Sequence, residues 1–193
     1  MPSLLNFADE IKLDHDNVRD LMQRFKAATA QDEKAAIANT MIREMAIHSD
    51  AEEISIYNEM GKHGMADVAK HNREEHASVK KLVYSADTTP ITSDNYDQVL
   101  ERAFVAFNTH AEEEERDEWP ALLAKLSSEE IDAYAREFLK ARAKAPPRPH
   151  PMAPQTGGIA QKAAALQATL HDKVVETLTS REFVDLKYKH PEI

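Results

Sequence analysis

The feature of this sequence that most restricts its fold is an internal repeat with a period of about 61 residues. Residues 14–21 (DHDNVRDL) resemble residues 75–82 (EHASVKKL), so two His residues are 61 positions apart. Residues 48–53 (HSDAEE) resemble residues 110–115 (HAEEEE) at an offset of 62 positions. A repeat of this length holds two helices. The sequence therefore predicts two similar halves related by an approximate two-fold axis.

Apolar residues recur at helical spacing through most of the first 126 residues. The expected helices span about 3–29, 31–60 and 65–86, with a fourth from a cap at 92–94 as far as the acidic run 112–115. Glycine is scarce, with only 4 residues in the chain, which also favours helices over turn-rich β structure. Four long helices joined by short loops predict an all-α, up-down-up-down four-helix bundle.

The chain continues beyond this bundle, which we assign to residues 1–126. An additional helix is expected over 127–143, since Ser127 and Glu130 form the signature of a capping box. Residues 144–158 hold five of the nine Pro and predict an extended linker. Residues 159–193 predict an amphipathic helix, over about 159–178, and a tail. We expect this helix to pack back across the bundle, with a partner-binding helix as the alternative.

Charge and composition exclude several classes of function. The formal net charge is −10, so neither nucleic acid nor an anionic membrane surface is an expected partner. The chain has no Cys, which excludes disulfides, thiolate metal sites and a Cys nucleophile. No apolar stretch is long enough to span a membrane, and no signal peptide is recognisable. A cytoplasmic location is the expectation.

Each of the four expected bundle helices carries one histidine on its apolar face. These are His15, His48, His76 and His110. One inward histidine is commonly a neutral, hydrogen-bonded core residue, but this set comes with Glu52 and Glu114, each one helical turn after a histidine. Burying two carboxylates beside four imidazoles is costly unless cations compensate the charge. Imidazole and carboxylate together suit iron, manganese or zinc.

The motif His-x-x-x-Glu occurs three times, and the copies differ in where they lie on their helices. His48 and His110 begin the two copies that follow an apolar face. The copy formed by His71 and Glu75 lies off the apolar stripe of its helix, so we attribute it to chance. Glu53 and Glu115 are expected to face solvent.

The ordered set of these histidines and glutamates resembles the hemerythrin-like proteins, also called HHE cation-binding domains, over about residues 4–123. The resemblance implies a non-haem di-iron centre: two iron ions joined by an oxo or hydroxo bridge and two carboxylates, which bind or react with dioxygen or peroxide. The metal ligands carried over by the resemblance are His15, His48, Glu52, His76, His110 and Glu114.

The sequence departs from the oxygen carriers of this family at one position. The carriers have a further His one turn before the third-helix His, and here that position is Asn72. Either His71 reaches inward through a π-bulge, or a nearby carboxylate or water substitutes. In the carriers the last carboxylate comes five residues after its His, which keeps Glu115 as a lesser candidate beside Glu114. An open position on one iron favours reaction over reversible transport.

The leading hypothesis is a small di-iron protein for oxygen or iron sensing, peroxide removal or oxidation of an unidentified small molecule, with an unidentified electron donor. Tyr57 and Trp119, each nine residues after a ligand His, are candidates for groups beside the metal or for electron donors, or else for apolar plugs. A metal-binding storage or sensing module without turnover is the alternative. A helical interaction protein without metal is the third possibility.

Overall fold

The computed structural model describes residues 4–153 and 181–191, together with Gly158, Gln161, Ala168 and Asp172. Regular structure in residues 4–153 is entirely helical, as predicted. The elements are α1 (Phe7–Ala27), α2 (Gln31–Ile54), α3 (Ile56–Met60), η1 (Gly61–His63), α4 (Ala66–Thr88), α5 (Tyr96–Glu113), η2 (Glu114–Glu118), α6 (Trp119–Leu123) and α7 (Ser128–Arg142). Apart from Gln161, Ala168 and Asp172, the helix expected over 159–178 lies outside the described residues.

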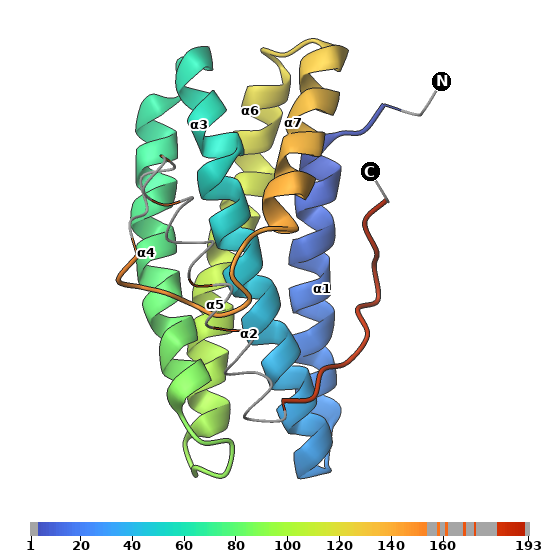
Figure 1. Cartoon of the computed structure of the whole chain (residues 1–193), viewed down its shortest axis with the longest axis vertical. Helices are drawn as coiled ribbons and strands as arrows, with labels where there is room; N and C mark the ends of the chain where they lie inside the picture. The colour runs from blue at the N-terminus through green and yellow to red at the C-terminus, as the bar shows by residue number, and fades with distance from the viewer. Residues whose placement is uncertain are drawn as a thin grey trace.

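Helices α1, α2, α4 and α5 form the predicted up-down-up-down bundle (Figure 1). Contacts run from α1 to α2, from α2 to α4, from α4 to α5 and from α5 back to α1, so the ring of four helices is closed. Helix α7 adds to this bundle at one end and packs on α1 and α2. In the part of the chain that the structure describes, no helix is long and apolar enough to cross a membrane.

Side-chain caps present in the sequence mark where α1 and α7 begin. The Asn6 side chain accepts a hydrogen bond from the Ala8 N–H and caps α1. At the start of α7, the Ser127 side chain accepts from the Glu130 N–H while the Glu130 side chain accepts from the Ser127 N–H. This is the predicted capping box. These contacts satisfy amide donors that a helix start would otherwise leave unpaired.

Two helices differ from their sequence-based expectation. The helix expected over 31–60 is interrupted at Ser55, whose backbone (φ −124°, ψ −90°) is not helical and whose hydroxyl donates to the Ala51 carbonyl at 2.5 Å. The fourth helix does not end at the acidic run, because it continues as the π-helix η2 into α6. The interruption at Ser55 comes three residues after Glu52, and η2 begins at Glu114, so each irregular segment lies beside a glutamate that faces the bundle interior.

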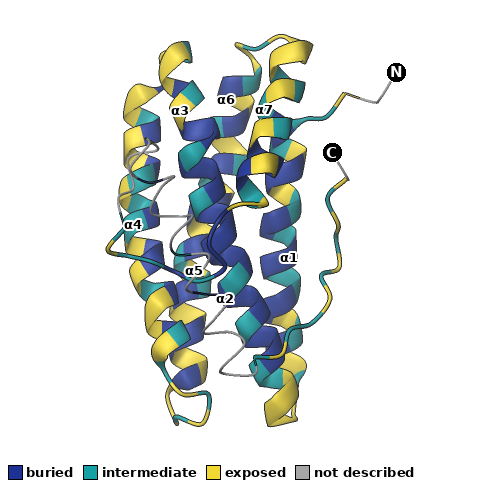
Figure 2. Ribbon diagram, in the orientation of Figure 1, coloured by how far each residue is buried: buried dark blue, intermediate teal, exposed yellow. Residues whose placement is uncertain are grey.

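The interior of the bundle holds two apolar clusters with a polar layer between them. One cluster fills the end of the bundle around Val18, Met41 and Leu100. The other fills the end around Phe7 and Trp119, where α7 also packs. Buried residues form a continuous interior stripe on every bundle helix, while exposed residues cover the outside and the two ends (Figure 2). The candidate site residues occupy the layer between the two clusters.

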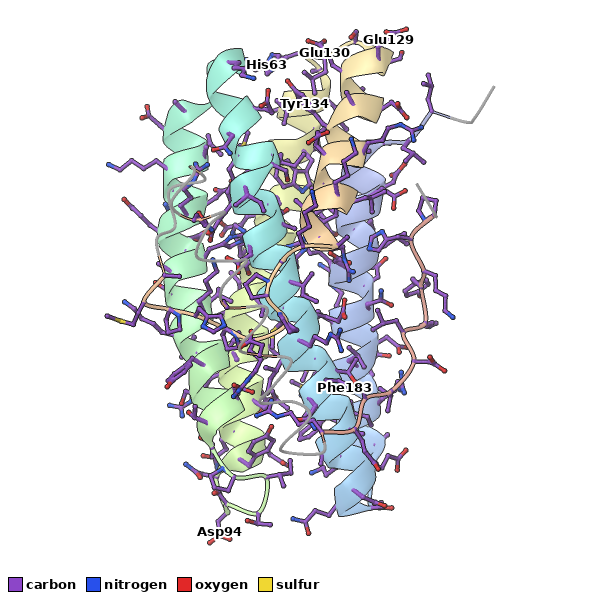
Figure 3. All side chains as sticks on the ribbon, in the orientation of Figure 1. His63, Asp94, Glu129, Glu130, Tyr134 and Phe183 are labelled. Atoms are coloured by element: carbon purple, nitrogen blue, oxygen red, sulfur yellow. The ribbon has the colours of Figure 1, made fainter. Side chains whose placement is uncertain are left out.

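Residues 181–191 run as an extended segment beside α1 (Figure 1), which we call the C-terminal strap. The side chain of Asn17 donates to the Tyr188 carbonyl at 3.0 Å and accepts from the Tyr188 N–H at 2.9 Å. Phe183, labelled in Figure 3, lies under the Arg43 guanidinium, 4.9 Å from the ring centroid. The strap is therefore fixed to the bundle by side chains of α1 and α2.

Candidate metal centre

The structure brings the predicted site residues together in the polar layer. They form two overlapping groups in which the potential ligand atoms lie within 4.8 Å of one another. Their side chains come from α1, α2, α4, α5 and η2, and each residue is at most 3% exposed. The first group is His15, His48, Glu52 and Glu114, and the second is Glu52, His76 and His110.

The two glutamates lie where they can join the two groups. Glu114 Oε2 is 3.6 Å from His15 Nε2, and Glu114 Oε1 is 3.4 Å from His110 Nε2. Glu52 Oε2 is 3.1 Å from His48 Nε2. Glu52 Oε1 and Glu114 Oε2 have no hydrogen-bond partner among the described residues. A buried carboxylate oxygen without a partner is costly, and a cation removes that cost. The donor set therefore fits a pair of metal ions.

A second layer of carboxylates contacts the outward-facing Nδ1 atom of each of the four clustered histidines. We call Asp14, Glu53, Glu75 and Glu115 the outer carboxylates. The nitrogen-to-oxygen distances are 2.7 Å for His15 to Glu115, 3.3 Å for His48 to Asp14, 3.2 Å for His76 to Glu53 and 2.7 Å for His110 to Glu75. A carboxylate at Nδ1 orients the ring and leaves Nε2 for a metal ion. All four imidazoles are thus fixed with Nε2 toward the centre.

The positions of Glu53 and Glu115 correct the sequence analysis, which expected both to face solvent. Glu53 is completely buried and accepts from the Lys80 ammonium at 2.7 Å. The Glu115 side chain is 23% exposed and accepts from Arg19 at 2.9 Å. The position that follows an inward residue is turned by about 100° around the helix. In this closed bundle that direction faces the neighbouring helix.

Burial and neighbouring charges shift the pKa values of the clustered glutamates and histidines in the polar layer. Burial and the nearby charge of Glu114 raise the pKa of Glu52 to about 7. Burial also opposes ionisation of Glu114, but the charge of His110 and its hydrogen bond outweigh it and lower the pKa of Glu114 to about 2. For His48, burial disfavours the cation, but the carboxylates of Glu52 and Asp14 outweigh it and raise the pKa to about 10.

Tyr57, carried by α3, lies in the middle of the second group of ligands. Its hydroxyl oxygen is 3.1 Å from Glu52 Oε2, His76 Nε2 and His110 Nε2, and 2.8 Å from Glu114 Oε1. Burial and the two carboxylates raise the pKa of Tyr57 well above its usual value. The interruption of the helix at Ser55 comes just before this residue. Because its hydroxyl contacts four of the clustered side chains, Tyr57 belongs to the candidate site and is not an apolar plug.

Asn72 takes the position of the histidine that the oxygen carriers have, and His71 does not replace it. Asn72 is buried, and its amide nitrogen donates to Glu118 at 2.6 Å, with Glu114 at 3.4 Å. The His71 side chain is 61% exposed on a regular α4. The alternative in which His71 reaches inward through a π-bulge is therefore wrong, and the π-helix lies on the fourth bundle helix instead.

Trp119 is 2% exposed and belongs to the apolar cluster that α7 covers. Its ring stacks 6.4 Å from the Tyr57 ring and meets Phe7 edge-on at 5.7 Å. Its indole Nε1 has no hydrogen-bond partner among the described residues. Trp119 therefore covers the Tyr57 side of the site as an apolar wall.

Comparison with known proteins agrees with this geometry. The sequence model of the hemerythrin HHE cation-binding domain matches residues 6–122. The chain is also similar to an uncharacterised hemerythrin-like protein of Schizosaccharomyces pombe, with 29% identity over 155 residues that cover 78% of this chain and 76% of the relative. No solved structure matches it. With the matched region spanning the whole four-helix bundle and all of the clustered histidines and glutamates, the chain belongs to the hemerythrin family of HHE cation-binding domains.

Proposed function

We propose that this protein holds two iron ions in a non-haem centre that binds or reacts with dioxygen or peroxide. The observation that best supports this function is the convergence of four imidazoles on two buried carboxylates that each retain an unpaired oxygen. Manganese and zinc suit the same donors. The proposed ligands are His15, His48, Glu52, His76, His110 and Glu114. When bound, iron supplies the electrons that dioxygen or peroxide accepts.

The chain contributes the surroundings in which that chemistry takes place. The outer carboxylates orient the four rings before metal arrives, so little rearrangement accompanies binding. The apolar clusters above and below exclude water from the polar layer. The ligands are nearly inaccessible, which favours very small reactants over a bulky organic substrate.

We infer further that Tyr57 is a metal ligand in place of the missing histidine. Adjacent donors around an octahedral ion lie about 3 Å apart when the bonds are about 2.1 Å long. The Tyr57 oxygen has this spacing to four other potential donor atoms. Asn72 has no imidazole nitrogen to offer: its amide nitrogen donates to Glu118, and only its Oδ1, which has no hydrogen-bond partner among the described residues, is left as a weak oxygen donor.

Metal analysis joined to oxygen exposure tests this function. Chain freed of metal by a chelator is loaded with Fe(II) without oxygen, desalted and analysed. We expect two iron ions per chain, and ferric charge-transfer absorption in the near ultraviolet after oxygen is admitted. Removing oxygen should leave the iron oxidised. Zero or one ion per chain contradicts the dinuclear centre, and repeated reversible oxygenation contradicts a reactive centre.

The burial of the ligands also favours a second function, a metal storage or sensing module without turnover. A centre whose ligands are at most 3% exposed is well suited to retaining its ions. Peroxide consumption by the iron-loaded chain separates the two functions. Catalytic consumption supports the reactive centre, whereas a single stoichiometric oxidation supports storage or sensing.

A further inference from the structure

Positive side chains neutralise three of the four outer carboxylates. Arg142 donates to Asp14 at 2.8 Å, Lys80 donates to Glu53 at 2.7 Å, and Arg19 donates to Glu115 at 2.9 Å. The fourth, Glu75, corresponds to Asp14 in the sequence repeat. Among the described residues, its ion-pair partners are the histidines His71 and His110 only. Within the described residues, the pseudo-symmetric arrangement therefore lacks one permanent cation, at Glu75.

A cluster of three potential metal ligands surrounds this position. His71 and Glu75 lie one turn apart on α4, and Glu113 is the last residue of α5. Their potential ligand atoms lie within 4.8 Å of one another. Glu75 Oε2 accepts from His110 Nδ1 at 2.7 Å, while Glu75 Oε1 is 3.5 Å from His71 Nε2. One oxygen of Glu75 thus holds the buried histidine and the other faces the cluster.

We propose that His71, Glu75 and Glu113 form an outer site for a divalent transition-metal ion. The ion takes the electrostatic place that Arg142 occupies beside Asp14 in the other half of the repeat. One imidazole and two carboxylates suit Zn²⁺, Mn²⁺ and Fe²⁺. The His71 side chain is 61% exposed and the Glu75 side chain 30%. Water can therefore complete the coordination, and ions here exchange readily.

The shared carboxylate gives this outer site a role in filling the buried centre. Because Glu75 contacts both His71 and His110, an ion held at the surface is separated from the buried ligands by a single side chain. The outer site collects metal ions at Glu75, the outer carboxylate to which the described residues give no Arg or Lys partner. This role, unlike the binding itself, rests on the proposed function of the buried centre.

Titration of the metal-free, full-length chain with Mn²⁺ tests the binding, with free Mn²⁺ followed by electron paramagnetic resonance. We expect one weak, exchangeable ion in addition to the tightly bound ions of the buried centre. His71→Ala and Glu113→Gln should each lower the affinity for this weakly bound ion about tenfold or more and leave the tightly bound ions in place. Glu74→Gln is the matched control, since its side chain is 66% exposed on the same turn of α4. It should bind like the wild type.

Several outcomes distinguish this site from the buried centre. A wild type without the weak ion, or a weak ion that survives in both variants, overturns the outer site. A weak ion lost in both variants while no tight ion binds supports the outer site and contradicts the proposed function. The filling role is tested by the rate at which Fe²⁺ enters the tight sites. We expect this rate to fall several-fold in His71→Ala, and an unchanged rate overturns the filling role.

Discussion

At the scale of single residues, each inward histidine of this protein is held at both ring nitrogens. Its Nε2 faces the shared glutamates, and its Nδ1 faces an outer carboxylate. An acceptor at Nδ1 determines which nitrogen carries the proton and so leaves the other as a ligand. His15 and Glu115 illustrate this at 2.7 Å, and Arg19 in turn holds Glu115. We therefore expect metal affinity to depend on residues that never touch the metal.

Glu115→Gln tests that dependence with little risk to the fold, because the side chain is partly exposed. An amide accepts from His15 less strongly than a carboxylate. We expect the affinity for Zn²⁺, measured by competition with a chelator, to fall about 10-fold to 100-fold. Glu112→Gln, an exposed neighbour bonded to Asn108, should match the wild type. Equal Zn²⁺ affinity in the two variants would contradict a role for Glu115 in metal binding through His15.

Tyr57→Phe tests whether the phenol oxygen is a ligand or only a hydrogen-bond donor. A phenolate bound to ferric iron gives a charge-transfer band at visible wavelengths, whereas a phenol that only donates gives none. We expect the oxidised iron form of the wild type to show this band and the Phe variant to lack it. Trp119→Phe changes the adjacent ring and should keep the band. A wild type without the band would show that Tyr57 is not a ligand.

Proton release on metal binding follows from the raised pKa of Glu52. Burial and Glu114 raise this pKa to about 7, so the carboxyl is increasingly protonated as the pH falls below 7. A metal ion must displace that proton. The His48 proton, whose pKa is about 10, must also be displaced, so the Zn²⁺ affinity, corrected for the chelator used, already falls with decreasing pH above 7. We expect the fall to steepen below pH 7 by a further factor of about ten for each pH unit, because the Glu52 proton is then displaced as well. A slope that does not steepen below pH 7 would show that Glu52 is not a ligand.

At the scale of elements, segments outside the four-helix bundle reach the polar layer. Arg142 of α7 and His190 of the C-terminal strap both contact Asp14, the outer carboxylate of His48. His190 Nε2 lies 2.8 Å from Asp14 Oδ1, and its Nδ1 lies 2.8 Å from Glu10 Oε2. The strap therefore contacts Asp14, which orients the proposed ligand His48, from the far end of the chain.

His190→Ala is expected to speed metal loss by removing one of the contacts that hold Asp14 against His48. The rate of Zn²⁺ transfer to a chelator should rise several-fold while the helix content by circular dichroism stays the same. His63→Ala is the control. His63 contacts Tyr134 at 2.9 Å at the end of the bundle opposite Asp94 (Figure 3), away from the polar layer. Equal rates in both variants would show that the strap does not act on the site.

At the scale of the whole molecule, the polar layer divides an otherwise apolar interior. Glu52 and Glu114 are buried, and one oxygen of each has no hydrogen-bond partner in the part of the chain that the structure describes. Ions that bind the folded chain and not the unfolded one stabilise the fold by mass action. On the proposed function, the stability of the fold and the occupancy of the metal centre are therefore coupled.

Removing the metal should lower the melting temperature. A free metal concentration a thousand times the dissociation constant adds about 4 kcal/mol to the free energy of unfolding. Thermal denaturation with and without a chelator measures the difference. His110→Ala, which lacks a proposed ligand, should show a smaller shift. Coincident curves for the wild type would contradict metal-dependent stability.

Signals within one helix, or repeated along the chain, were enough to predict the bundle, the capping box at Ser127 and the six clustered histidines and glutamates. Helical period alone decides which residues share a face. The outer carboxylates were also present in the repeat, as Asp14 with Glu75 and Glu53 with Glu115. Judged on one helix at a time, however, Glu53 and Glu115 were expected in solvent.

Only the tertiary structure decided which side chains meet across helices. Asp14 holds His48 and not its neighbour in sequence, and the Tyr57 hydroxyl reaches potential ligands of four other segments. The strap, with no periodic pattern of its own, is placed by paired contacts to residues such as Asn17. Such contacts depend on the rotation and spacing of packed helices. Sequence periodicity fixes the face of each helix, but the neighbour that face meets is set when the helices pack together.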